Sequence, residues 1–194
     1  MDKPLSRREL SHQRIVDAAA RAIRRSGYAG TGVADIMKEA GLTHGGFYAH
    51  FKSRDALLAE AVARAGQSNA GRLDRKIQSL GREGASPLRV LVESYLSDEH
   101  LAATETGCVV SALISEMPRQ APEVREASAV RVRGLIERVR GALPEGADPA
   151  RAELITACMV GGLQLARAVG PGREAQAMLK SIRENLLTQY DTAS

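Results

Sequence analysis

The sequence predicts an all-α fold, in which a small N-terminal unit of three helices precedes a larger C-terminal helical bundle. Three observations support this prediction. Apolar residues recur at helical spacing along the 194-residue chain. Ala, Leu, Arg, Glu and Val are abundant and β-branched runs are scarce, which favours helices. Hydrophobic residues make up 44% of the chain and aromatic residues only 3%, so we expect a substantial and mainly aliphatic core.

The first helix is expected to begin near Ser6, because Ser6 and Glu9 have the spacing of a capping box. An apolar stripe that includes Ile15 and Ile23 continues it, and Gly27 is a natural C-terminal stop. Thr31 is the expected N-cap of a short second helix that ends at Gly41.

The second and third helices of residues 33–51 are separated by only Gly41-Leu42-Thr43. Glycine supplies the positive φ that a tight turn needs, Leu42 can fill the core, and Thr43 can cap the third helix. This spacing is the helix-turn-helix pattern, whose second helix normally enters the DNA major groove. Phe47 and Phe51, at i and i+4, predict the buried side of the third helix.

The opposite side of the third helix is small or polar, which would allow its backbone to approach DNA closely. We expect phosphate contacts from Tyr48, His50, Lys52 and Thr43, and a base-edge contact from His44. The alternative is that Tyr48 and His50 only complete the core of the small unit. The charge distribution favours a polyanionic partner, because residues 1–55 hold ten basic and six acidic residues, whereas the remainder holds seventeen of each.

Residues 10–62 resemble the N-terminal domain of the TetR/AcrR family of transcription regulators. The resemblance rests on Ile15–Ala19, Gly27-Tyr28, Thr31–Ile36 and, above all, Ala40–Leu57. It implies an all-helical homodimer that binds a palindromic operator, usually as a repressor. It also implies phosphate contacts at Thr31 or its neighbour, at Tyr48 and at Lys52, and base contacts at the start of the third helix. The predicted DNA-binding residues are Thr31, Thr43, His44, Gly45, Gly46, Tyr48, His50 and Lys52.

Two residues depart from the family pattern. Gly46 stands where a side chain able to touch a base is common, and His50 stands where a second aromatic residue is usual. Part of the sequence preference is therefore expected to come from DNA shape.

The C-terminal part is expected to hold further helices: one from Ser53, weakened at Gly66 and Gly71, and others at about 87–96, 108–117, 122–143, 149–169 and from 172 to 189. We expect a DNA-binding domain at residues 1–52 and a ligand-binding and dimerisation domain at residues 53–194. The last two helices are more apolar than one core face requires, which predicts a four-helix dimer interface. The alternative is a central helix buried in a monomer.

The helices between Pro87 and Leu143 are expected to enclose a cavity for a small molecule. Each candidate residue is alternatively a simple packing residue. Cys108, at a predicted helix start, could react with electrophiles, and its segment looks like that of a family branch that senses reactive compounds; the alternative is an inert buried thiol. The candidate ligand-binding residues are Tyr95, His100, Cys108, Met117, Met159 and Gln164.

Other function classes find little support in the sequence. Cys108 and Cys158 are too far apart to form a disulfide framework or a metal cluster, and the four histidines lack ligand spacing, so we expect no metal and no cofactor. No catalytic constellation, signal peptide or continuous apolar span is visible, so we expect a cytoplasmic protein without enzymatic activity. The expected function is a repressor that a small-molecule inducer releases from DNA. The alternatives are an electrophile- or redox-sensing regulator acting through Cys108, and a DNA-binding activator without a ligand.

Overall fold

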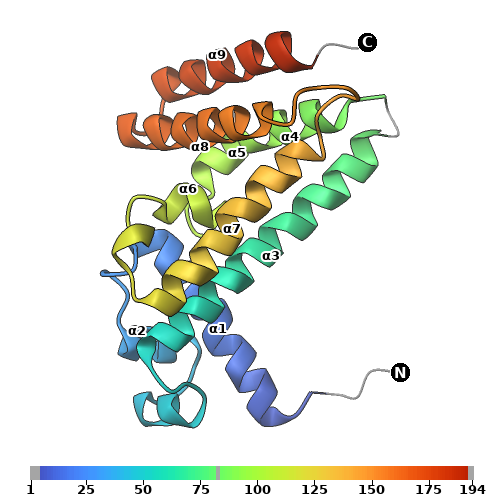
Figure 1. Cartoon of the computed structure of the whole chain (residues 1–194). Coiled ribbons are helices and arrows are strands. Elements are labelled where there is room, and N and C mark those ends of the chain that lie inside the picture. The colour runs from blue at the N-terminus through green and yellow to red at the C-terminus, as the bar shows by residue number, and fades with distance from the viewer. Residues whose placement is uncertain (1–4, 82–83, 192–194) are drawn as a thin grey trace.

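The computed structural model describes residues 5–81 and 84–191, and all its regular elements in these ranges are helices (Figure 1). The predicted all-α fold is therefore confirmed. The elements are α1 (Arg7–Ser26), α2 (Val33–Glu39), the 3-10 helix η1 (His44–Ala49), α3 (Arg54–Gly81), α4 (Pro87–Tyr95), α5 (Asp98–Ala102), α6 (Val109–Leu113), the 3-10 helix η2 (Met117–Arg119), α7 (Pro122–Arg140), α8 (Arg151–Val169) and α9 (Arg173–Tyr190).

The long helix α3 connects the two ends of the molecule. Its first turns pack against α1, whereas its length lies beside α7 (Figure 1). α2 and η1 lie at the lower end with the start of α3, and α8 and α9 pack against each other at the opposite end (Figure 1). The buried residues of all these helices form one continuous core, so the N-terminal helices are not packed separately from the rest.

The helix starts show which capping predictions were correct. Ser6 and Glu9 form the complete capping box, with each side chain bonded to the other's backbone N–H. Ser53 Oγ accepts a bond from the N–H of Ala56 at 3.0 Å, and Ser86 Oγ caps α4 ahead of Pro87. Thr43 is the N-cap residue of η1, as predicted, but its hydroxyl makes no capping bond. The predicted N-cap at Thr31 is wrong, because Gly32 is the N-cap of α2 and the Thr31 hydroxyl bonds to Gly27 instead.

The C-terminal helices differ from the prediction at several boundaries. α3 continues through Gly66 and Gly71 without ending, because its packing against α7 outweighs the low helix propensity of two glycines. The helix expected at 108–117 is split into α6 and η2, and α7 ends at Arg140 instead of near residue 143. α8 starts at Arg151 instead of residue 149, and the Asp148 carboxylate accepts a bond from the N–H of Ala150 in the turn before it.

Helix α8 is the most apolar of the long helices. Of the helices described, it alone combines the length and mean hydropathy of a membrane span, although 44% of its most apolar window is buried inside the fold. Its outward side carries Leu154, Leu165 and Val169, which are exposed. α8 therefore contributes to the core on one side and presents an apolar surface on the other.

Candidate functional site

The turn between α2 and η1 is closed by backbone hydrogen bonds. The N–H of Leu42 donates to the carbonyl of Met37 and the N–H of Gly41 to that of Lys38, both at 2.9 Å, which is the pattern of a Schellman motif. Gly41 has φ +69°, so the predicted need for glycine at this turn is confirmed. Leu42 packs against the core, as expected, and the turn sets the angle between α2 and η1.

Two phenylalanines anchor η1 to the core. Phe47 and Phe51 are buried and their rings stack with centroids 5.6 Å apart, so the predicted buried side of this segment is confirmed. The segment is a 3-10 helix over His44–Ala49, not the regular α-helix through Phe51 that we expected. Adjacent glycines at 45 and 46 weaken helix formation, and short pieces of this kind commonly adopt the tighter 3-10 form.

The side of η1 opposite the two phenylalanines faces outward. Tyr48 is 76% exposed, which argues against the alternative that it completes the core. Thr43, His44, Gly45 and Lys52 are also exposed. Gly45 has nothing near the position that a Cβ would take, so the backbone itself is open to an approaching surface. These residues, together with the half-buried Gly46, are here called the η1 face: Thr43, His44, Gly45, Gly46, Tyr48 and Lys52.

Thr31 does not share this exposure. Its side chain is 4% exposed, and its hydroxyl donates to the carbonyl of Gly27 at 2.7 Å, which closes the loop after α1. The hydroxyl is thus bonded within the protein, and Thr31 does not belong to the exposed residues that could contact DNA. The neighbouring Gly32 is exposed at the N-terminus of α2 and offers its backbone instead.

His50 lies at the edge of the η1 face and is half-buried. Its ring is next to His12, with centroids 6.0 Å apart. Burial lowers the pKa of His50, and electrostatic interaction with His12 and Arg8 lowers it further. The imidazole is therefore neutral near pH 7.

Two arginines of α1 support the site, and the sequence analysis did not identify them. Arg8 donates to the carbonyl of Ala49 at 2.8 Å, and Arg14 donates to the carbonyl of Ala40. These carbonyls lie at the ends of η1 and α2, where helices leave acceptors unsatisfied. The sequence analysis included both arginines only in the basic excess of residues 1–55. Their acceptors are 41 residues away for Arg8 and 26 residues away for Arg14, and nothing in the local sequence indicates such bonds.

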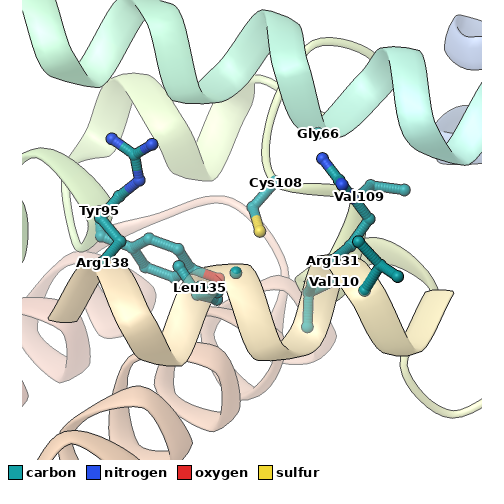
Figure 2. A pocket seen from close by; sticks show the side chains of 10 residues that line it. Gly66, Tyr95, Cys108, Val109, Val110, Arg131, Leu135 and Arg138 are labelled. Carbon is teal, nitrogen blue, oxygen red and sulfur yellow. The ribbon is translucent and has the colours of Figure 1, made fainter. Parts of the chain in front are cut away.

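A pocket of about 230 Å³ lies between α3, α4, α6 and α7 (Figure 2). Tyr95 and Cys108 from the predicted ligand-binding set line it, and Arg131 and Arg138 reach it from α7. The two arginines were not predicted, since α7 reads as a solvated helix with many charges. The lining residues are Gly66, Tyr95, Cys108, Val109, Val110, Val130, Arg131, Gly134, Leu135 and Arg138.

The other predicted ligand residues lie outside this lining. Met117 and Met159 are buried among core residues, and Gln164 is half-buried on α8. His100 lies behind the pocket wall. Its Nδ1–H donates to the carbonyl of Tyr95 at 2.7 Å, and its Nε2 accepts the N–H of Cys108 at 2.9 Å. His100 therefore fixes the positions of two lining residues without lining the pocket itself.

The segment 103–108 connects the pocket wall to the N-terminal helices. Arg24 of α1 donates to the carbonyl of Gly107 at 3.3 Å, directly before Cys108. Arg25 pairs with Glu105, also at 3.3 Å. Gly107 is needed here, because a Cβ would come within 2.8 Å of the His100 ring and 2.6 Å of a carbonyl oxygen. A displacement at Cys108 would thus also displace the partners of Arg24 and Arg25 at the end of α1.

Comparison with known proteins agrees with this geometry. The family model described as bacterial regulatory proteins, tetR family, matches residues 15–61, which include α2, the turn and η1. The transcriptional regulator AcrR of Shigella flexneri is 35% identical over 95 residues, which are 49% of this chain and 43% of that protein. The chain thus spans less than half of AcrR. An uncharacterised HTH-type transcriptional regulator of Mycobacterium tuberculosis is 28% identical over 193 residues, covering 94% of this chain and 97% of that protein.

The fold is also found in solved structures. The structure of Escherichia coli NemR in its reduced form has a TM-score of 0.77 and 19% sequence identity, covering 94% of this chain and 99% of that one. This likeness extends over both the N-terminal helices and the bundle. The likeness to solved structures shows the fold, and the family model together with the regulators that match in sequence identifies residues 15–61 as a DNA-binding domain of the TetR/AcrR family of transcription regulators.

Proposed function

We propose that the protein is a cytoplasmic repressor that binds a palindromic operator as a homodimer and is released by a small molecule. The observation that carries the DNA-binding role is the η1 face, which is exposed and rigidly backed by Phe47 and Phe51. In this proposal Tyr48, His50, Lys52 and Thr43 contact phosphates, and His44 contacts a base edge. The bare backbone at Gly45 lets η1 approach the floor of the major groove.

The dimer in this proposal forms through α8 and α9. Leu154 and Leu165 are 52% and 58% exposed on α8, and large apolar side chains grouped on one helix favour a protein partner. A two-fold pair of such helices makes a four-helix interface. The two η1 faces would then reach successive major grooves about 34 Å apart. We retain the division into domains 1–52 and 53–194 as part of the proposal, with α3 as their shared support.

The pocket supports the ligand-responsive part of the proposal. It is bounded by four helices of the C-terminal bundle, and the segment 103–108 joins its wall to Arg24 of α1. A ligand that favours one position of this wall would shift the population of dimers away from the spacing that fits DNA.

Selection of bound duplexes from a random DNA pool tests the central proposal. We expect a palindromic site, with an affinity that falls as salt rises because phosphate contacts release counterions. Binding to the selected duplex by fluorescence anisotropy then gives the affinity. The proposal would be abandoned if no duplex bound with a salt-dependent affinity.

A second candidate function is sensing of electrophiles through Cys108, whose side chain lines the pocket. In this candidate the thiol adds across the activated double bond of a compound such as N-ethylmaleimide. A sulfur–carbon bond forms, the carbon–carbon double bond becomes single, and the thiol proton ends on the neighbouring carbon. The structural likeness to a protein solved in a reduced form is consistent with this candidate.

Mass spectrometry separates the two functions. The chain has two cysteines, so Cys158→Ser leaves Cys108 as the one thiol and Cys108→Ser leaves Cys158. Sensing through Cys108 predicts that N-ethylmaleimide modifies Cys158→Ser once and releases its DNA, while Cys108→Ser keeps its DNA. DNA release from both variants alike would exclude this candidate.

A further inference from the structure

Two buried hydrogen-bond donors line the pocket without an acceptor at ordinary hydrogen-bond geometry in the part of the chain that the structure describes. Tyr95 is only 4% exposed, and its hydroxyl meets no acceptor at ordinary hydrogen-bond geometry among the described residues. The side chains of Cys108 and Ser111 are close enough for a weak hydrogen-bonding interaction that shifts its pKa. Nε of Arg131 is likewise buried without a partner in that part of the chain. Buried polar groups are nearly always bonded, and these are the two unbonded ones that line this pocket, so an occupant with acceptor oxygens would satisfy both.

Both groups act as donors at neutral pH. Burial raises the pKa of Tyr95 well above its ordinary value, and the neighbouring Cys108 raises it further, so the hydroxyl keeps its proton. A guanidinium has donors only and stays charged. The occupant must therefore present acceptor oxygens to both groups.

The charge of the lining favours an anion. Arg131 and Arg138 are the charged side chains that line the pocket within the described residues, and both come from α7. Guanidinium groups match carboxylate geometry and bind it with charge-assisted hydrogen bonds. A Cβ at Gly66 would come within 2.3 Å of Arg131 Cδ, so the glycine in α3 leaves the room in which this arginine lies.

The placement of the two donors and the volume of the pocket limit the size of the occupant and the positions of its oxygen atoms. Figure 2 shows Tyr95 and Arg131 on either side of Cys108, with Arg131 directed toward Gly66. Val109, Val110 and Leu135 provide an apolar wall. The volume of about 230 Å³ lies below the roughly 300 Å³ at which drug-sized sites begin. A single small molecule would have to carry one oxygen near each end.

We propose that the pocket binds a small monocarboxylate with a second oxygen acceptor on an apolar body, as in a hydroxy- or oxo-acid. Its carboxylate bonds to Arg131, its second oxygen accepts a hydrogen bond from Tyr95, and its hydrocarbon part lies against the valines of α6. This inference rests on the proposed function, because it names the chemical class of the inducer. It differs from the electrophile candidate, since binding here needs no covalent bond.

Calorimetric titration of the full-length protein with two matched series tests this chemistry. The first series is 4-hydroxybenzoate, benzoate without the second oxygen, and phenol without the carboxylate. The second is 4-oxopentanoate, pentanoate and 2,5-hexanedione. We expect the doubly oxygenated acid of at least one series to bind best and the compound without a carboxylate to bind worst. Equal affinities within both series, or no saturable binding by either acid, would overturn the proposal.

Two variants assign the contacts. Tyr95→Phe removes only the hydroxyl and should weaken the doubly oxygenated acid about 2- to 12-fold, leaving the simple acid unchanged. Arg131→Met keeps the aliphatic stem over Gly66 and should weaken both acids about 10- to 100-fold. Arg125→Met, an exposed position on the same helix, is the matched control and should bind as the unaltered protein does. Unchanged affinities in Arg131→Met would place the carboxylate elsewhere.

The same preparations, tested against the selected DNA duplex, keep the two proposals apart. DNA binding without acid binding would remove the ligand assignment and leave the regulator intact. Acid binding without DNA binding would remove the proposed function and leave the pocket chemistry standing.

Discussion

Gly41 has a positive φ at the end of α2, and its place in the helix-turn-helix makes it sensitive to a side chain. We predict that Gly41→Ala lowers the free energy of unfolding by about 1–2 kcal/mol, because a left-handed conformation is strained for alanine. A Cβ would also meet Arg14 Nη2 at 2.6 Å and disturb its bond to the α2 carbonyl. Urea unfolding measures the loss.

Gly45→Ala is the matched control for Gly41→Ala. Nothing lies near its Cβ position and its φ is not positive, so the unfolding free energy should change little. Because Gly45 lies on the η1 face, this variant should instead weaken DNA binding. Equal losses of stability in both glycine variants would contradict the explanation.

Lys52 and Tyr48 carry no sequence information in the proposed interface, since they contact phosphates. Lys52→Ala should weaken binding to all duplexes alike and reduce the salt slope by about 1, and Tyr48→Phe should weaken binding without altering sequence preference. His44→Ala should also relax the preference at one base position, at a cost of about 1–3 kcal/mol for the preferred base. Anisotropy titrations at several salt concentrations against selected and altered duplexes test this. A change of preference in Lys52→Ala would contradict the assignment.

His50 makes stability depend on pH. Its pKa in the folded protein is lower than its ordinary value of 6.5, so the unfolded chain binds the proton at higher pH than the folded chain does. The unfolding free energy should therefore decline as pH falls below about 6.5 and toward the folded pKa. His50→Asn should flatten this decline. Urea unfolding at pH 7.5, 6 and 5 measures it, and an unaltered decline in the variant would exclude His50 as its cause.

At the scale of elements, the helices that the sequence predicted well carry their own signals. The Ser6 capping box, the Gly27 and Gly41 stops and the Ser86-Pro87 start all depend on residues within a few positions of each other. The predictions that were wrong depend on distant contacts. Thr31 turns inward because Gly27 offers it a carbonyl, and η1 is a 3-10 helix because two glycines weaken it while Phe47 and Phe51 hold it to the core.

The candidate sites follow the same division. The η1 face could be predicted from helical spacing, whereas its support by Arg8 and Arg14 could not. In the pocket, Tyr95 and Cys108 were predicted, while Arg131 was not, because its position over Gly66 depends on how α3 and α7 cross. Helix α5 was missed altogether, since five residues are too few for a periodic pattern.

The connection between α5 and α6 gives an element-scale prediction. Gly107→Ala should lower the free energy of unfolding by about 1–3 kcal/mol, because its Cβ would collide with a carbonyl and with the His100 ring in a close-packed interior. Gly134→Ala, inside α7 with open space around it, should instead be neutral or gain up to about 1 kcal/mol. Thermal and urea unfolding compare the two. A neutral Gly107→Ala would show that the segment moves freely.

At the scale of the whole molecule, the exposed leucines of α8 predict the oligomeric state. Leu165→Glu should convert a dimer of 20.7-kDa chains into monomers, because a charge at the centre of an apolar interface is costly to bury. DNA affinity should fall with it, since one chain reads only half a palindrome. Leu10→Glu, at an exposed leucine on α1, is the control and should remain dimeric. Sedimentation equilibrium measures both, and a dimeric Leu165→Glu would place the interface elsewhere.

The continuous helix α3 has a mechanical consequence. The pocket touches it at Gly66, twelve residues from its start at Arg54, which is about 18 Å at the rise of an α-helix. A pivot of about 10° at that point would swing the start of the helix by about 3 Å. Leu57 and Leu58, near the start of α3, lie in the same core as Phe47 of η1. A movement of the start of α3 would therefore move the η1 face with it. In the proposed dimer, two such movements would change the distance between the η1 faces, so that a small occupant of each pocket would release a much larger DNA duplex.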